Sequence, residues 1–155
     1  MNTFLLGLHN LLRWILLLLL VINLIRHFTA INQPFGNTDK KLGLWLMISA
    51  HTQLLIGLIL WFAGAWGFQN FKNNGMAGVM QNSTARFFAV EHTIAMIIAI
   101  ALITVARGIF RKNLTDGKKH SRCIVLYALA LIIILAMIPW PGMDDMGRSL
   151  VPKFG

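Results

Sequence analysis

The sequence predicts an all-α integral membrane protein whose four transmembrane helices form an up-down-up-down bundle. Of its 155 residues, 57% are hydrophobic and only 12% are charged, whereas a soluble domain has about 45–50% apolar and about 25% charged residues. The apolar residues lie in four long runs, and short polar segments between them carry most of the basic residues. A chain of this length normally forms one domain, so we expect residues 1–155 to form a single four-helix unit.

The apolar runs cover residues 4–25, 42–67, 87–106 and 123–138. At a rise of about 1.5 Å per residue they are the size needed to cross about 30 Å of hydrocarbon, although the last is short. No small-residue cleavage pattern follows the first run, so we expect it to stay as a helix rather than to be removed as a signal peptide. Residues 68–85, rich in Asn and Gly, are expected to form the longest outer loop, partly ordered on the membrane surface.

The second and fourth runs have similar starts, Thr38-Asp39-Lys40-Lys41 and Thr115-Asp116-Gly117-Lys118-Lys119. A Thr or Asp side chain accepts hydrogen bonds from the free N–H groups of a first helical turn. We therefore expect both helices to begin at the same membrane surface, with the lysines among the head groups.

The distribution of basic residues predicts the orientation. Nine of them lie between runs one and two or between runs three and four: Arg26, Lys40, Lys41, Arg107, Arg111, Lys112, Lys118, Lys119 and Arg122. The opposite side has four: Lys72, Arg86, Arg148 and Lys153. The positive-inside rule predicts that the first set is cytoplasmic and that both termini are periplasmic. It also accounts for the net charge of +9 without nucleic acid as a partner.

The ionisable residues within the runs are His9, Arg13, His51, Glu91 and His92. Each is a candidate for function, because an ionisable group in hydrocarbon costs about 2.5–3.5 kcal/mol on insertion scales. The chain has a single cysteine, Cys123. An internal disulfide, a cysteine-based zinc or iron–sulfur site and a covalent c-type haem are therefore excluded.

His9 and His92 are expected at the same depth. Both lie about 7–8 Å inside the outer boundary if each run is centred on the midplane. Runs one and three are diagonal neighbours in an up-down-up-down bundle, so the two imidazoles can approach one haem b iron from opposite sides. Beside His92, alanines 85, 99 and 106 form a small-residue stripe that leaves room either for a flat cofactor or for close helix packing.

His51 is about 12 Å deeper than these two residues. It lies nearly opposite the polar and small residues of its own helix, such as Gln53 and Gly57. The pattern therefore does not decide which face of this helix is buried. His120 is deeper still, and a second haem between His51 and His120 is geometrically strained. We expect His120 in a cationic surface patch, or near a propionate if a second haem exists.

Arg13 and Glu91 are about 7 Å apart in depth and within reach of an ion pair. The pair either clamps two helices, or Arg13 holds a haem propionate while Glu91 accepts protons near a quinol site. A metal site for copper or zinc, formed by His9, His92 and Glu91, is an alternative. Because adjacent residues point about 100° apart on a helix, joint ligation by Glu91 and His92 is disfavoured.

Five motifs give the chain a resemblance to small bacterial four-helix membrane proteins that are labelled cytochrome b or cytochrome b-like. They are His9-Asn10-Leu11-Leu12-Arg13-Trp14, His51-Thr52-Gln53-Leu54-Leu55-Ile56-Gly57, Arg86 through Glu91-His92, Lys119-His120 and Ile138-Pro139-Trp140-Pro141. The resemblance extends over nearly the whole chain. It implies noncovalent haem b, a bacterial cytoplasmic membrane, and electron transfer that involves a quinone or a partner complex.

The function expected from these features is haem-based electron transfer in the membrane. His9 and His92 are the leading iron ligands, and His51, His120 and Arg13 are further cofactor contacts. The chain is at most a quinol-linked electron-transfer subunit, and any catalysis beyond electron transfer needs another subunit. We expect partner membrane subunits or further copies of the chain. The rival is a cofactor-free accessory subunit, in which the polar stripes are helix contacts within a larger assembly.

Overall fold

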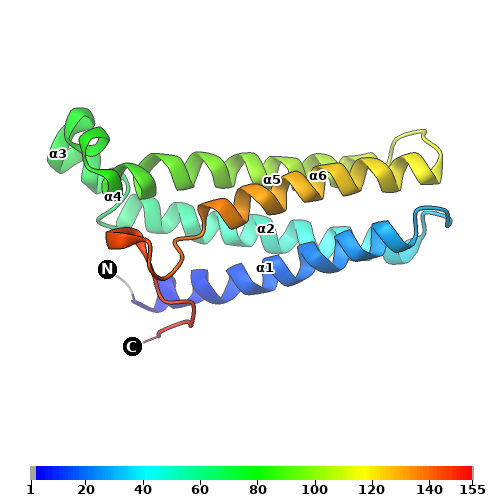
Figure 1. The fold of residues 1–155 in the computed structure, drawn as a ribbon, viewed down its shortest axis with the longest axis horizontal. Helices are drawn as coiled ribbons and strands as arrows, with labels where there is room; N and C mark the ends of the chain where they lie inside the picture. Colours follow the sequence, from blue (N-terminus) through cyan, green and yellow to red (C-terminus); the bar gives the residue numbers. More distant parts are fainter. Residues whose placement is uncertain (1–2, 155) are drawn as a thin grey trace.

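A computed structural model describes residues 3–154, and over that range the chain is helical and contains no strand. The elements are α1 (Thr3–Thr29), α2 (Asn37–Ala63), α3 (Phe68–Gln81), α4 (Ser83–Arg86), the π-helical turn η1 (Phe87–Glu91), α5 (His92–Ile109), α6 (Asp116–Met137) and the short 3₁₀ turn η2 (Asp144–Met146). Elements α4, η1 and α5 follow each other directly as one helical rod, Ser83–Ile109. Four long rods therefore make up the bundle (Figure 1).

The four rods form a ring in which neighbours in space are α1, α2, α5 and α6 in that order. Helix α1 packs against α2 and α6, and α5 packs against the same two helices. Helices α1 and α5 are therefore diagonal, as the up-down-up-down prediction requires. Both described chain ends lie at the same end of the bundle as α3, and we call this the terminal end (Figure 1). The opposite end holds residues 30–36 and 110–115, and we call it the loop end.

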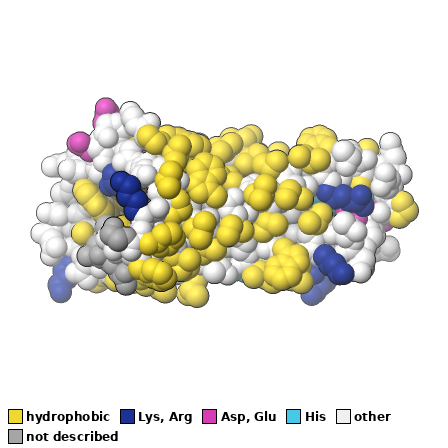
Figure 2. All heavy atoms as spheres, turned by 90° about the horizontal axis from the view of Figure 1, so that it is seen from below, with side chains coloured by type: hydrophobic (Ala, Val, Ile, Leu, Met, Phe, Trp, Pro, Cys, Tyr) yellow, Lys and Arg dark blue, Asp and Glu magenta, His cyan; other side chains and the backbone are white. Residues whose placement is uncertain are grey.

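The bundle is apolar on its outside as well as in its core. Within residues 3–154, four helices are long and apolar enough to cross a membrane. Large side chains such as Leu18, Leu55 and Ile132 are at least 60% exposed. In Figure 2, apolar side chains cover the middle of the visible face, while Lys and Arg lie toward its two ends. Exposing such an apolar surface is unfavourable in water and favourable in lipid.

The helices extend beyond the apolar runs at the loop end. Helix α2 begins at Asn37 and α6 at Asp116, several residues before the runs that predicted them, because the polar lysine-containing segments form their first turns. The two starts do lie at the same end of the bundle (Figure 1). Their caps differ, since Asp39 Oδ2 accepts a 2.8 Å hydrogen bond from Gly36 N, whereas the Thr115 side chain forms no cap bond.

Residues 68–85 connect the second and third rods as predicted, but they are helical and do not form a loop that is only partly ordered. This segment forms α3, bent at Gly75 where φ is +68°, and then α4. The Asn82 side chain caps α4 by accepting a hydrogen bond from Ala85 N at 2.8 Å. The asparagines and glycines that indicated a loop therefore serve as a cap and a bend between short helices.

Gly67, the residue before α3, has no room for a side chain. A Cβ built there would lie 2.0 Å from the Trp61 backbone oxygen, and a backbone atom cannot move aside as a side chain does. We expect Gly67→Ala to lower the free energy of unfolding by about 1–3 kcal/mol. Gly108→Ala is the matched control, because a Cβ there meets nothing within 4 Å. Thermal unfolding in detergent, followed by circular dichroism, measures both; equal melting temperatures would contradict the prediction.

Candidate cofactor cavity

A cavity of about 450 Å³ lies at the terminal end of the bundle. Its walls come from all four long helices and from the segment that follows α6. Most of the lining is apolar and includes Leu54, Leu58, Met96 and Ile134. Cofactor sites usually have volumes of about 300–1,000 Å³, apolar walls and a few well-placed polar groups. The polar groups of this wall therefore indicate what it can hold.

His92 and His9 both line the cavity, the first from α5 and the second from the diagonal helix α1. His92 Nδ1 lies 2.8 Å from the backbone oxygen of Met137 on α6. A carbonyl only accepts, so Nδ1 carries the proton and Nε2 keeps its lone pair. Metal-ligating histidines commonly donate their other ring N–H to a carbonyl in this way, which fixes the orientation of the ring.

The ring nitrogens of His9 form no short hydrogen bonds with the described residues. Gln53 of α2 donates its amide to the His9 backbone oxygen at 2.9 Å, and the same amide nitrogen lies 3.4 Å from His9 Nε2. His9 Nδ1 is buried without a hydrogen-bond partner among the described residues. A Cβ at Gly57 would lie 3.2 Å from His9 Cε1, so the glycine makes the space in which the ring stands.

Cationic side chains complete the wall. Arg13, Arg148 and Lys153 line the cavity, and its described lining contains no Asp or Glu. Arg13 also donates hydrogen bonds to the Asn10 side chain and, at 3.4 Å, to the Leu150 backbone oxygen. Two imidazoles and several cations around an apolar space suit a flat anionic metal complex, since imidazoles ligate iron and arginines bind carboxylates. The residues present therefore fit a haem with its propionates.

The segment after α6 was not predicted to contribute. Residues Ser149 and Leu150 lie along α1, where Asn10 Nδ2 donates to Ser149 O at 2.9 Å and Trp14 Nε1 donates to Leu150 O at 2.8 Å. The one sequence feature that could have predicted this contact is the set of side-chain donors in the first turns of α1. These donors hold the segment against the cavity, where Arg148 lies in the wall.

The predicted pairing of Arg13 with Glu91 is wrong. Glu91 accepts a 2.7 Å ion-pair hydrogen bond from Arg86 instead, and it does not line the cavity. The π-helical turn η1 explains this, because residues five apart approach each other in such a turn. The alternative metal set of His9, His92 and Glu91 is not assembled either, since Glu91 stands outside the space that the two histidines share.

His51 and His120 also lie outside the cavity. His51 is exposed, with Nε2 3.1 Å from Thr104 Oγ1 of α5, whereas Ser49 and Gln53 are buried. The buried face of α2 is thus the polar and small-residue face. The expectation that His120 lies in a surface patch is wrong: it is fully buried at the loop end and contacts His27. The structure does not bring His51 and His120 together.

Comparison of the chain with protein-family models, with curated proteins and with solved structures finds no match.

Proposed function

We propose that this chain binds one haem b in the terminal-end cavity and transfers electrons within a membrane. The observation that carries the proposal is the presence of His9 and His92, from diagonal helices, in the wall of one cavity of suitable size. In helical bundles, cofactor sites are built from side chains on facing helices. His9 and His92 would hold the haem iron.

The proposed setting is the bacterial cytoplasmic membrane. The four long apolar helices support contact with lipid. By the positive-inside rule, the basic connections of the loop end would face the cytoplasm and both termini the periplasm. The cavity would then lie near the periplasmic surface, with Arg13 and Arg148 toward the head groups.

Each residue has a definite role in this proposal. The Met137 carbonyl would fix the tautomer of His92, Gln53 would hold the α1 backbone at His9, and Arg13 and Arg148 would bind the propionates. Apolar walls would exclude water. A haem held by His9 and His92 would supply reversible one-electron transfer.

The electron donor and acceptor would be a quinone, a partner membrane subunit or another copy of the chain. If a quinol is oxidised at this end, Glu91 is the proposed proton acceptor. Its side chain is 41% exposed beside Arg86, so a proton could leave it for water. The cofactor-free accessory subunit remains the rival function.

Absorption spectroscopy of the purified protein tests the proposal. Protein made in haem-replete cells and purified in detergent should contain about one noncovalent haem per chain, with a Soret band that sharpens and shifts on reduction. Electron paramagnetic resonance of the oxidised protein should give the low-spin signal of bis-histidine iron. Correctly folded protein that lacks haem under these conditions would refute electron transfer and favour the accessory subunit.

A further inference from the structure

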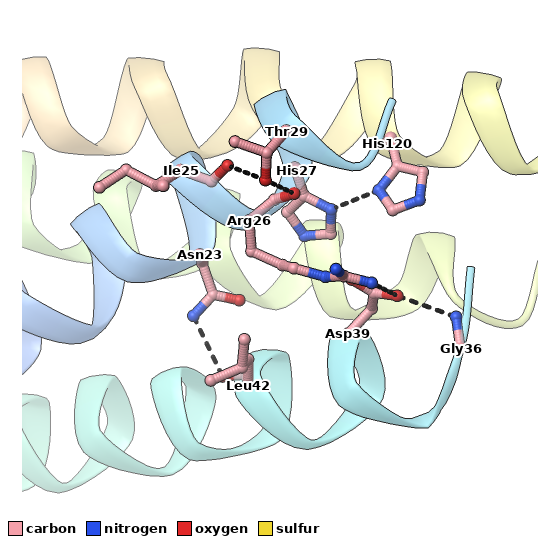
Figure 3. A network of polar contacts seen from close by, with 9 residues as sticks. All are labelled: Asn23, Ile25, Arg26, His27, Thr29, Gly36, Asp39, Leu42 and His120. Carbon is pink, nitrogen blue, oxygen red and sulfur yellow. Dashed lines mark hydrogen bonds and ion pairs between the residues drawn. The ribbon is translucent and has the colours of Figure 1, made fainter. Parts of the chain in front are cut away.

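A second polar cluster lies at the loop end, away from the cavity. It consists of His27 on α1, Asp39 in the first turn of α2 and His120 near the start of α6, and all three residues are 0% exposed. One ligand atom from each lies within 4.8 Å of the others. Figure 3 shows the two rings facing each other, with Asp39 and Arg26 beside them. Three helices thus bring three metal-ligating side chains together inside an apolar core.

The two rings meet through their Nδ1 atoms, which are 2.8 Å apart. Two neutral imidazoles can share only one proton at such a contact, so one ring must then carry its proton on Nε2. Both Nε2 atoms are buried, and neither has a hydrogen-bond partner among residues 3–154. With a hydrogen bond, one buried Nε2–H has no acceptor, and with a cation on both Nδ1 atoms both Nε2–H groups have none, so these groups do not distinguish the two arrangements. In both arrangements the two Nδ1 atoms point toward each other beside the Asp39 carboxylate, where a cation could be shared.

The Asp39 carboxylate is fixed in position by hydrogen bonds. Arg26 donates to Oδ1 at 2.8 Å and to Oδ2 at 3.3 Å, and Gly36 N donates to Oδ2 at 2.8 Å. A carboxylate has about four acceptor positions, so these bonds leave one on Oδ1. Carboxylates that ligate metals are themselves commonly hydrogen-bonded in this way. Asp39 can therefore offer one oxygen while Arg26 fixes its orientation.

We propose that His27, His120 and Asp39 bind one divalent first-row transition ion, for which Zn²⁺ is the probe. Imidazole nitrogen with carboxylate oxygen is a donor set that suits zinc, iron and nickel. Zinc bonds of about 2.0–2.2 Å in a tetrahedron place two donors roughly 3.3 Å apart. The rings need to separate by only about 0.5 Å from their present contact to reach that spacing. The ion would tie α1, α2 and α6 together where their connections meet.

This inference goes beyond the proposed function, because the ion and the haem would occupy opposite ends of the bundle. Neither His9 nor His92 belongs to the loop-end cluster, and neither His27 nor His120 lines the cavity. Zinc binding and haem binding can therefore succeed or fail separately.

Equilibrium dialysis against Zn²⁺ tests the site. The full chain in detergent, with its affinity tag cleaved and after treatment with a chelator, should take up one zinc per chain by mass spectrometry of the metal. His27→Gln and His120→Gln should each weaken uptake by at least about 100-fold, the upper end of the loss seen when outer-shell partners are removed. Arg26→Gln should weaken it by about 10–100-fold. His51→Gln is the matched control, since that histidine is exposed, and it should bind zinc like the unaltered chain.

X-ray absorption at the zinc edge keeps the test independent of how well the variants fold. The unaltered chain should show nitrogen and oxygen neighbours with the outer-shell scattering of two imidazoles. Zinc bound without imidazole scattering, uptake unchanged in both histidine variants, or no saturable uptake would each overturn the proposal and leave a His–His hydrogen bond. A His92→Ala protein that lacks haem but still takes up one zinc would show that the two sites are independent.

Discussion

Replacing His92 with alanine should remove the haem from the protein. The variant loses a proposed iron ligand that the Met137 carbonyl orients, and His9 is then the remaining histidine in the described lining of the cavity. We expect haem affinity to fall by at least about 100-fold, more than the 10–100-fold that loss of an outer-shell partner causes. Haemin titration of the apoprotein, followed at the Soret band, measures the change.

His92→Met separates ligation from packing. A thioether can still ligate the iron, and His/Met ligation raises the reduction potential. This variant should therefore keep haem and show a higher midpoint potential in a redox titration. His120→Ala should keep both haem and potential, because His120 lies at the other end of the bundle. Unaltered haem affinity in the alanine variant of His92 would show that this residue is not a ligand.

Replacing Asp39 with alanine should cause the largest loss of stability at the loop end. Its carboxylate is fully buried, accepts two hydrogen bonds from Arg26 and also accepts one from Gly36. Removing one partner of a buried ion pair costs about 3–5 kcal/mol. Arg26 is 29% exposed and recovers part of this by hydration, so we expect about 3 kcal/mol. At about 2–4 °C per kcal/mol for this size, the melting temperature should fall by roughly 6–12 °C.

Asp116→Ala is the matched control for this variant. Asp116 follows a threonine as Asp39 does and lies in the first turn of α6, but it is exposed. Its removal should change the free energy of unfolding by no more than about 0.5 kcal/mol, as is usual for surface substitutions. Both variants are compared in chelator-treated protein, so that metal binding does not contribute. Similar melting temperatures for the two would show that the Arg26–Asp39 pair contributes little.

The long helices and the diagonal relation of α1 and α5 were predictable because they depend on properties that single sequences display. Apolar run length and the alternation of more basic and less basic connections predict the number and direction of the helices. Depth along two parallel helices then places His9 and His92 at one level, and the structure brings both into one cavity.

The His27–His120 contact was missed because the fourth helix was measured from its apolar run. That run begins at residue 123, whereas the helix begins at Asp116 and places His120 in its second turn. His120 then continues the buried row formed by Cys123, Tyr127 and Ala130 at steps of three and four. A hydropathy boundary hides such a turn, because its lysines face outward while its histidine faces inward.

The π-helical turn η1 affects whether the chain can lose a residue at this point. A π turn holds one more residue than an α turn, so deleting one residue from Phe87–Glu91 would restore regular α-helix. Because the turn absorbs the additional residue, the helical segments on its two sides would keep nearly the same rotation about their common axis. The deletion would change the local contacts of the turn, which include the Arg86–Glu91 pair and the 2.9 Å hydrogen bond from Trp61 Nε1 to Ala89 O. Homologous chains can therefore lose one residue here and still keep the buried faces of α4 and α5 aligned.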